Sequence, residues 1–399
     1  MAKVKKSASP AGKILYLITQ SELGGAQSYI FDLAKNLKEE YEISVAFGLS
    51  RNRRGEPGEA GELAKALKSE EISAFFLPHL KRRICPRNDL WAYFEIKALI
   101  KKLEPDIIHL NSSKISILGS LAARAVKSKK TQIIYTAHGW VFNEPMSGIK
   151  KAFYKWAEKF TARYKDKIIC VSEFDRQAAL KEEIAPAEKL VTIHNGIGEI
   201  NFLTKEDARQ KLNLPPDSLV IGSIGNLYKT KGFEYFIEAA ASLLKSQLSG
   251  QTKAQAGQTA RSPLAFIIIG EGGERKNLEA LINKHHLEKQ FILAGRISDA
   301  SRLLKAFDVY VSSSVKEGLS YTLIEAVQAG LPIVATEVGG NPEVLAGYSA
   351  DLVEPGDSQA LAEKISRHLG RPFPIKKIPQ GFTLREMLEK TKKIYASSF

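Results

Sequence analysis

The sequence predicts an α/β protein with two doubly wound, Rossmann-like domains, and three observations support this prediction. A chain of 399 residues is longer than one ordinary hydrophobic core organises, so two domains are expected. Short apolar strands alternate with helical segments along most of the chain, which is the order of a parallel sheet with crossover helices. Hydrophobic residues make up 44% and charged residues 26% of the chain, as in globular proteins.

Changes in composition along the chain predict where the domains begin and end. We expect a disordered tail at residues 1–12, an N-terminal domain at 13–200, a C-terminal domain at 201–384 and a final helix at 385–399. Residues 246–263 are small, polar and without periodicity, so they are expected to form a flexible insertion on the surface.

The sequence carries no pattern typical of membrane insertion, secretion or metal binding. No apolar run approaches the 18 or more residues of a spanning helix, and the first residues lack the hydrophobic centre of a signal peptide. Two cysteines, Cys85 and Cys170, occur without a CxxC motif or a Cys/His cluster, which favours reduced structural thiols. We therefore expect a cytoplasmic protein without a metal cofactor.

The net charge of +14 is concentrated in the first half of the chain. Residues 1–200 carry 33 Lys/Arg against 23 Asp/Glu, or +10, which indicates an anionic partner. An anionic membrane, a phosphorylated acceptor and nucleic acid are the candidates, and an excess that only aids solubility is the alternative.

Two basic segments are candidates for contact with lipid headgroups. Residues 149–167 carry Phe153, Trp156 and Phe160 at helical spacing with lysines between them. This composition is typical of a membrane-surface helix, and a core helix with a solvated face remains the alternative. The second segment is the KRR run at residues 81–83.

The N-terminal domain places glycines and histidines where strands end. The strand KILYLIT leads into a loop with Gly24 and Gly25, and a helix follows. His109 and His138 follow the apolar strands of PDIIHL and QIIYTAHGW, at the carboxyl ends where parallel sheets bind ligands. A structural role for a histidine at a strand end is the alternative.

The C-terminal domain contains glycine-rich turns that do not match a dinucleotide-binding fingerprint. LVIGSIGNLYKTKG, AFIIIGEGGE and FILAGRIS each read as a strand followed by a loop. G-x-G-x-x-G is absent, because GEGGER has Arg275 where the third glycine belongs.

The stretch AFDVYVSSSVKEGLSYTLIEAVQAGLPIVATEVGGNPEV predicts a strand, a loop, a helix and a second strand. Backbone donors at the helix start, on Ser320, Tyr321 and Thr322, predict a phosphate site. Glu325 lies in the first or second turn and can accept two hydrogen bonds from a ribose diol. Together these features predict a nucleotide.

Glu317, on the loop of the same stretch, could instead form a glycosidase pair with Glu325. If all eight intervening steps were helical, the two carboxylates would lie about 12 Å apart along the axis. This separation exceeds the roughly 5 to 9.5 Å that glycoside hydrolysis requires, so a glycosidase is disfavoured.

EGLSYTLIEAVQAGLPIVATEVGGNPEV resembles the E-x7-E signature of the retaining glycosyltransferases of family 4 (group 1). The resemblance implies the GT-B fold, in which two Rossmann-like domains face a cleft and the final helix crosses back to the N-terminal domain. It also implies roles for individual residues: Gly24 and Gly25 near the donor phosphates, His138 and Glu317 at the donor sugar, Lys231 at the diphosphate, and Gly270, Gly272, Arg296 and Ile297 around the nucleobase.

The sequence departs from the family pattern at two positions. Asn226 stands where an arginine is common, five residues before Lys231, and whether Lys229 replaces that charge stays open. Gly198 stands where the family has aspartate in the loop that begins with Asn195.

The resemblance implies a hexosyltransferase that moves a sugar from a UDP- or GDP-linked donor to a glycan, lipid-linked or cell-envelope acceptor, with retention of configuration. No metal is expected, because the sequence contains no D-x-D. Peripheral contact with the inner face of an anionic membrane is expected, and contact with nucleic acid is not. The alternatives are a nucleotide-sugar epimerase or phosphorylase on the same fold, and a non-enzymatic anion- or nucleic-acid-binding protein.

Overall fold

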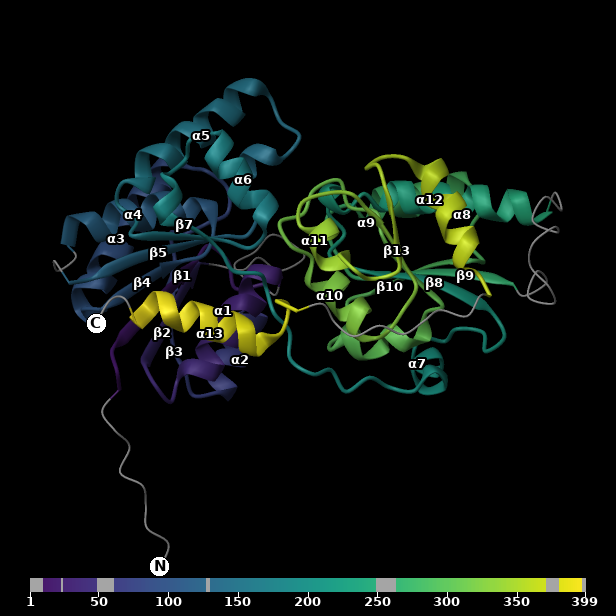
Figure 1. Cartoon of the computed structure of the whole chain (residues 1–399), viewed down its shortest axis with the longest axis horizontal. Helices are drawn as coiled ribbons and strands as arrows, with labels where there is room; N and C mark the ends of the chain where they lie inside the picture. Colours follow the sequence, from purple (N-terminus) through teal and green to yellow (C-terminus); the bar gives the residue numbers. More distant parts are fainter. Residues whose placement is uncertain are drawn as a thin grey trace, which may run out of the picture. The chain divides into compact units, whose positions relative to one another are not determined.

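The computed structural model describes residues 10–22, 24–48, 61–126, 130–248, 263–370 and 380–396. It divides into two compact units, Met1–Asn195 with Leu384–Phe399, and Gly196–Thr383 (Figure 1). Most of the expected tail at 1–12 and most of the expected insertion at 246–263 lie outside the described residues. Residues 246–248 are helical, since helix α8 extends over Phe233–Leu248, so the expectation of a loop from residue 246 is wrong at its start.

The N-terminal unit is built on a parallel seven-stranded sheet with the order β3-β2-β1-β4-β5-β6-β7. Chain order reverses between β1 and β4, which is the topological switch point of this sheet. The strands are β1 (Lys13–Ile18), β2 (Glu42–Gly48), β3 (Ser73–Leu77), β4 (Ile107–Leu110), β5 (Gln132–Ala137), β6 (Lys167–Cys170) and β7 (Leu190–Thr192).

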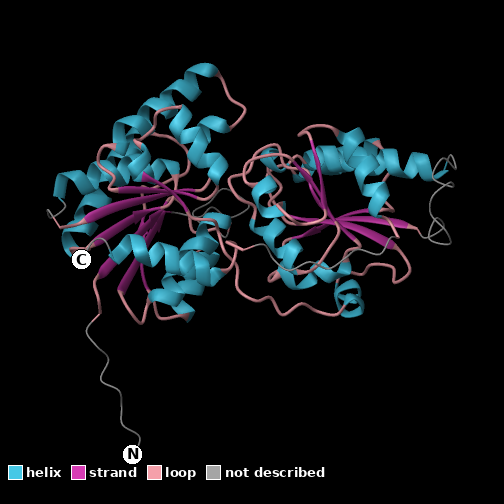
Figure 2. Cartoon of the chain, viewed as in Figure 1, coloured by secondary structure: helices cyan, strands magenta, loops and turns pink. Residues whose placement is uncertain are grey.

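Helices cover both faces of this sheet (Figure 2). Helices α1, α2 and α13 pack together on one face, and α3, α4 and α5 pack in sequence on the other (Figure 1). Their bounds, with α6, are α1 (Gly25–Leu37), α2 (Glu62–Ser69), α3 (Pro86–Leu103), α4 (Ser113–Val126), α5 (Gly148–Ala162), α6 (Glu173–Lys181) and α13 (Leu384–Ala396). The final helix therefore packs with the N-terminal unit, although the chain enters it from the other unit.

Helix α5 packs one face against the N-terminal unit, but Phe153 and Trp156 are not on that face, which corrects their placement in a core stripe. Phe153 and Trp156 are 52% and 61% exposed, whereas Ala157, Glu158 and Thr161 are buried. The helix also ends at Ala162, five residues before the expected end.

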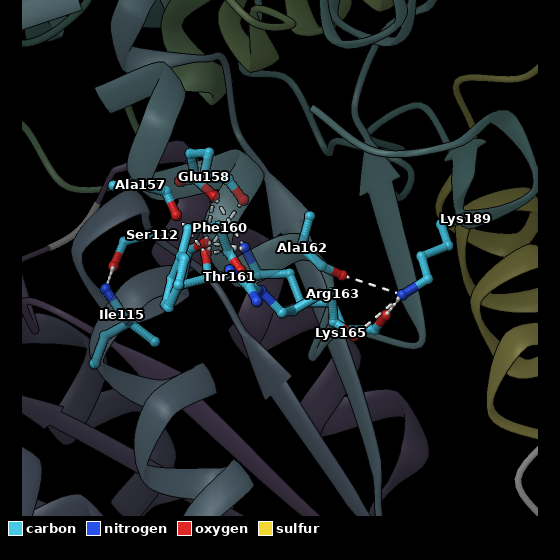
Figure 3. Close-up of polar contacts among 11 residues, drawn as sticks. Ser112, Ile115, Ala157, Glu158, Phe160, Thr161, Ala162, Arg163, Lys165 and Lys189 are labelled. Carbon is cyan, nitrogen blue, oxygen red and sulfur yellow. Dashed lines mark hydrogen bonds and ion pairs between the residues drawn. The ribbon is translucent and has the colours of Figure 1, made fainter. Parts of the chain in front are cut away.

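A buried polar cluster explains this orientation (Figure 3). The Lys165 Nζ donates to Glu158 Oε2 at 2.9 Å, to Ser116 Oγ at 2.6 Å and to Thr161 Oγ1 at 3.1 Å. Burial lowers the pKa of Lys165, while the Glu158 carboxylate acts in the opposite direction. Because a buried charge needs these partners, the face that carries Glu158 and Thr161 must turn inward. The aromatic face is consequently turned outward.

The C-terminal unit is built on a parallel six-stranded sheet with the order β10-β9-β8-β11-β12-β13, and its switch point lies between β8 and β11. The strands are β8 (Leu219–Ile224), β9 (Leu264–Ile269), β10 (Phe291–Gly295), β11 (Val309–Ser312), β12 (Ile333–Thr336) and β13 (Ala350–Val353). The other helices are α7 (Lys205–Lys211), α9 (Arg275–Lys284), α10 (Tyr321–Gln328), α11 (Asn341–Leu345) and α12 (Ser358–His368). Two doubly wound α/β units are therefore confirmed.

Candidate active site

The candidate residues of the C-terminal unit lie in loops that follow four adjacent strands of its sheet. Asn226 and Lys231 follow β8, Gly270 and Gly272 follow β9, Arg296 and Ile297 follow β10, and Glu317 follows β11. Lys231 and Glu317 therefore come from the two strands that flank the switch point, where open parallel sheets bind ligands. The structure brings together residues that are 86 positions apart in the sequence.

Lys231 and Glu317 form an ion pair at this switch point. The Lys231 Nζ lies 2.5 Å from Glu317 Oε1, and the Ser314 Oγ donates to the same oxygen at 2.7 Å. The side chains are 23% and 11% exposed, so the pair is partly desolvated and still reachable. Partial burial strengthens the attraction between the two charges.

Backbone contacts hold the loops that carry this pair. The Val315 amide donates to the Thr230 carbonyl at 2.9 Å, and the Ser313 Oγ donates to the Lys231 carbonyl at 3.1 Å. Gly232 has a φ of +56°, and a Cβ there would meet the Ser313 carbonyl oxygen. Glycine is therefore needed at 232 for the two loops to approach, which fixes the position of Lys231.

Helix α10 begins one residue after Ser320, as predicted, but its first donors are not all directed outward. The Ser320 Oγ accepts from the Leu323 amide at 3.4 Å and bonds the Thr322 Oγ1 at 3.2 Å. The Ser320 side chain thus caps the helix at the Leu323 amide, and the phosphate site at the backbone amides of Ser320, Tyr321 and Thr322 stays a prediction. Only residues 321–328 are helical, so the 12 Å spacing calculated for an entirely helical segment does not apply.

Glu325 lies in the second turn of α10, close to the buried Tyr310 of β11. Burial raises the pKa of Tyr310, the Thr322 hydroxyl that hydrogen-bonds it lowers that pKa, and the negative charges of Glu325 and Glu317 raise it. The charges of both glutamates of the E-x7-E stretch therefore act on one buried phenol.

The remaining candidate residues of this unit lie on the loops after β8, β9 and β10, whose backbones contact each other directly. The Gly270 amide donates to the Gly295 carbonyl at 2.9 Å. A Cβ at Gly270 would meet the Gly225 carbonyl oxygen, and one at Gly272 would meet the Leu227 carbonyl oxygen. These two glycines are thus required by packing alone. Asn226 and Ile297 are partly exposed beside these loops, and Arg296 is exposed.

The candidate residues of the N-terminal unit also follow strands around the switch point. Gly24 and Gly25 follow β1 and open α1, whose start has no side-chain cap. His138 follows β5. The Thr19 Oγ1 and Ser112 Oγ lie 2.6 Å apart, which ties the loop after β1 to the loop after β4.

His138 has two neighbours that orient its ring. The Nε2 lies 3.4 Å from Asn111 Oδ1, and the Tyr29 ring contacts the imidazole edge to face with centroids 5.0 Å apart. Burial lowers the pKa of His138 to about 3, so the ring is neutral at neutral pH. The Asn111 Nδ2 donates to the His109 carbonyl, which leaves Oδ1 to accept from His138 Nε2–H. The Nδ1 of His138 is then an acceptor.

The structural alternative holds for His109. It is fully buried in β4, and both of its ring nitrogens are hydrogen-bonded, to Tyr395 and to Thr136.

Sequence reasoning missed the partners that hold the candidate residues in place. Ser314, Asn111 and Tyr29 contact Glu317 and His138, but each is one of many serines, asparagines or tyrosines. Ser314 precedes Glu317 by three residues, and this short spacing was the one local signal available.

The described residues contain neither a cluster of metal ligands nor a helix that could span a membrane. No group of three or more His, Cys, Asp or Glu side chains in the described ranges is placed to hold a metal ion. None of the helices described is both long and apolar enough to cross a membrane. Cys85 and Cys170 are free thiols.

Comparisons with known proteins match both halves of the chain. Residues 204–378 match the family described as Glycosyl transferases group 1, and residues 23–198 match Glycosyltransferase Family 4. The UDP-Gal:alpha-D-GlcNAc-diphosphoundecaprenol alpha-1,3-galactosyltransferase of Escherichia coli is 29% identical over 350 residues, which is 84% of this chain and 87% of the relative. An O-antigen biosynthesis glycosyltransferase, WclY of Escherichia coli, is 22% identical over 97% of this chain and 99% of the relative.

Solved structures share the fold over nearly the whole chain. Anabaena HepE in complex with UDP-glucose superimposes with a TM-score of 0.74 at 20% identity, covering 97% of this chain and 100% of that one. A glycosyltransferase from Rickettsia africae gives a TM-score of 0.72 at 23% identity, covering 97% and 98%.

Proposed function

Because the chain belongs to the group 1 glycosyltransferases with the GT-B fold, we propose that it transfers a sugar from a nucleoside-diphosphate donor with retention of configuration and without a metal ion. The observation that carries the proposal is the ion pair of Lys231 and Glu317 at the switch point, beside the start of α10. The donor diphosphate is the anion that this cation and this helix N-terminus would bind.

In the proposed mechanism Lys231 stabilises the departing diphosphate. The bond between the anomeric carbon and the diphosphate oxygen breaks, and negative charge develops on the diphosphate. Lys231 and the amide end of α10 oppose this charge before the reaction begins, so no reorganisation is needed. The Lys231 charge takes the place of a bound metal in this scheme, which fits the absence of D-x-D from the sequence.

Retention follows if the acceptor attacks from the face that the diphosphate leaves. The acceptor oxygen bonds the anomeric carbon, and its proton passes to the departing phosphate oxygen. The Glu317 carboxylate is engaged by Lys231 and Ser314, which supports a role in holding charge and orienting the sugar over a role as nucleophile. His138, with Nδ1 as an acceptor, would take a hydrogen bond from a sugar hydroxyl.

We propose a UDP-sugar as the first donor to test, because the Escherichia coli relative and the HepE complex both carry UDP in their names. Glu325 would accept hydrogen bonds from the ribose, and the loops that carry Asn226, Gly270, Gly272, Arg296 and Ile297 would surround the nucleobase.

A lipid-linked acceptor is proposed because the Escherichia coli relative is named for a diphosphoundecaprenol substrate. Two exposed apolar groups in the N-terminal unit fit contact with the membrane that would hold such a lipid. Leu90, Trp91 and Phe94 on α3 are 57%, 52% and 48% exposed, and Ile149, Phe153 and Trp156 on α5 are 85%, 52% and 61% exposed. We call these two groups the aromatic surface.

Basic side chains accompany the aromatic surface. Lys81, Arg82 and Arg83 precede α3, and the Lys114 Nζ of α4 fixes their loop by donating to the carbonyls of Lys81 and Arg83 at 2.7 and 2.9 Å. Lys150 and Lys151 lie on α5, together with Lys155 and Lys159, which are ion-paired with Glu182 and Glu183. Aromatic rings with interleaved cations match an anionic bilayer interface, where each cation contributes about 1 kcal/mol.

The experiment that tests the function is incubation with UDP-, GDP- and ADP-sugars and a polyprenyl-diphosphate sugar. A new glycoside on the lipid is the expected product. An epimerised donor, or a sugar phosphate formed with inorganic phosphate, would instead indicate one of the alternative enzyme classes. Thermal stabilisation by one nucleotide class identifies the donor, since a ligand at about 100 times its Kd adds roughly 2.7 kcal/mol.

A further inference from the structure

A chain of hydrogen bonds joins helix α13 to the residues that hold His138. Its members are fully buried side chains from α1, α13 and the strands β1, β4 and β5: Tyr16, Tyr29, His109, Thr136, Thr391 and Tyr395. The Tyr395 hydroxyl lies 2.6 Å from His109 Nδ1 and 3.1 Å from the Tyr16 hydroxyl. On the other side of the imidazole, His109 Nε2 lies 2.7 Å from Thr136 Oγ1.

The direction of every hydrogen bond in this chain can be assigned from its end. Thr391 donates to the Met387 carbonyl at 2.8 Å, so it accepts from the Tyr29 hydroxyl that hydrogen-bonds it. Tyr29 then accepts from Thr136, at 3.3 Å. Each hydroxyl has one proton, so Thr136 must accept from His109.

This assignment determines the state of His109. The proton of the imidazole is on Nε2, and Nδ1 accepts from the Tyr395 hydroxyl, which in turn accepts from Tyr16. Burial and the neighbouring His138 lower the pKa of His109 to about 3, in agreement with a neutral ring. Two members of the chain, Tyr395 and Thr391, lie on α13, and the Tyr16 end lies on β1.

Two contacts connect the chain to the candidate active site. Tyr29 lies in α1, the helix that Gly24 and Gly25 open, and its ring packs against the His138 ring. Asn111 links the His109 carbonyl to His138 Nε2. A change at Thr391 therefore reaches His138 through Tyr29. A change at Tyr395 reaches it through His109, and then through Asn111 or through Thr136 and Tyr29.

We propose that Tyr395 and Thr391 are positioning residues, through which α13 fixes the His138 ring and the start of α1 for the transfer reaction. The proposal rests on the proposed function and deepens it, because it attributes the orientation of His138 to helix α13. Tyr395 of this helix lies 286 residues after His109 in the sequence. The chain enters α13 from Thr383 of the C-terminal unit, and α13 itself belongs to the N-terminal unit, whose candidate site it supports.

The first test uses protein labelled with ¹⁵N in histidine and needs no substrate. We expect wild-type His109 to show a protonated Nε2 and an unprotonated Nδ1. The Tyr395→Phe variant keeps the ring and removes the donor, so the His109 Nδ1 signal and the His138 ring signals should both shift. The control is Tyr348→Phe, which removes a buried hydroxyl that donates to the Leu331 carbonyl at 2.7 Å. Unchanged His138 signals in Tyr395→Phe, or the same shifts in the control, would overturn the proposal.

The second test separates positioning from stability. Thr391→Val removes the acceptor of Tyr29 at nearly constant volume, whereas Thr391→Ser keeps the hydroxyl. We expect kcat to fall about tenfold in Thr391→Val with the donor KM unchanged, and Thr391→Ser to retain the wild-type rate. Equal rates for Val and Ser would contradict the proposal. A wild-type protein without turnover on any nucleotide sugar would instead refute the proposed function, and the histidine spectra would still test the positioning chain.

Discussion

The two units present chemically opposite candidate sites at the carboxyl ends of their parallel strands: Lys231 and Glu317 flank the switch point of one sheet, and His138 follows β5, next to the switch point of the other. In the C-terminal unit, the Lys231–Glu317 ion pair is partly exposed and supported by loops a few residues long. In the N-terminal unit, His138 is neutral and is oriented by Asn111 and Tyr29, and fully buried tyrosines, threonines and His109 lie behind it. One site is suited to bind a charged phosphate, and the other to form neutral hydrogen bonds with a sugar or an acceptor.

Because of this difference, substitutions in the two sites should affect the enzyme in different ways. Loss of a charge in the C-terminal site should act directly on binding or turnover. Loss of a buried polar group behind the N-terminal site should change the position of the His138 ring or the pH dependence of stability. The following predictions test that contrast.

The largest effect is expected for Lys231→Ala, which removes the cation opposite the leaving diphosphate. Turnover should fall by roughly 10² to 10³, the loss associated with one preorganised donor in other enzymes. Lys229→Ala is the matched control, because Lys229 lies in the same turn and is exposed. Steady-state kinetics of both variants measures the two losses of turnover. Equal losses would mean that positive charge in general, and not the lysine paired with Glu317, promotes the reaction.

Glu325 and Glu317 should separate donor binding from chemistry. Glu325→Ala should weaken nucleotide binding about tenfold to a hundredfold, since hydrogen bonds to a charged group contribute about 1.5–3 kcal/mol. Glu317→Ala should mainly slow transfer. Calorimetric titration with the nucleotide measures the first effect, and unchanged affinity for Glu325→Ala would remove its ribose role.

The aromatic surface predicts binding to anionic vesicles. Phe153→Ser combined with Trp156→Ser should reduce co-sedimentation about tenfold, because two amphipathic rings leave the interface. Phe174→Ser, an exposed aromatic on α6, is the control. Added salt should weaken the binding, because screening reduces the attraction between lysines and headgroups. Equal binding to neutral and anionic vesicles would contradict the assignment.

The N-terminal unit should lose stability in acid. The pKa of His109 and of His138 is lowered from 6.5 to about 3, so below 6.5 the unfolded chain takes up protons that the folded unit excludes. Stability is complete above that pH and falls toward pH 3, by up to about 1.4 kcal/mol per pH unit for each histidine. Asp32 opposes this slope, because its pKa is raised to about 7.

The variant His109→Gln isolates one part of that slope. Between neutral pH and about pH 5, its unfolding free energy should change less steeply than that of the wild type, by the contribution of one histidine. Denaturant unfolding followed at several pH values measures the difference. Identical slopes would show that His109 is protonated without cost in the folded protein.

The sequence predicted those parts of the molecule that a local pattern of apolar residues, or a motif with a known chemical role, identifies. Alternating strands and helices predicted both sheets, and the E-x7-E stretch predicted the loop and helix around Glu317 and Glu325. The Lys231–Glu317 pair was not predicted as a contact, because residue spacing does not show which loops meet above a sheet. Once β8 and β11 are adjacent, the pair follows from their loops.

The N-terminal site was less accessible to sequence reasoning because its contacts are long-range. The sequence placed His138 at the end of a strand. The hydrogen bond between Tyr395 and His109, however, joins residues that are 286 positions apart, and no local pattern indicates it. Helix α5 was misleading for a related reason. Its aromatic residues recur at the spacing of a buried helix face. The buried Lys165–Glu158 ion pair requires another face of the helix to point inward, and hydrophobic periodicity does not reveal such a pair.

The most direct test of retaining, metal-independent transfer is an NMR spectrum of the first-formed product in the presence of EDTA. We expect turnover to continue under chelation and the new glycoside to have the anomeric configuration of the donor sugar. Lys231→Ala should give the same anomer at a much lower rate. A product with the inverted anomer, or a reaction that stops when metal ions are chelated, would contradict the mechanism.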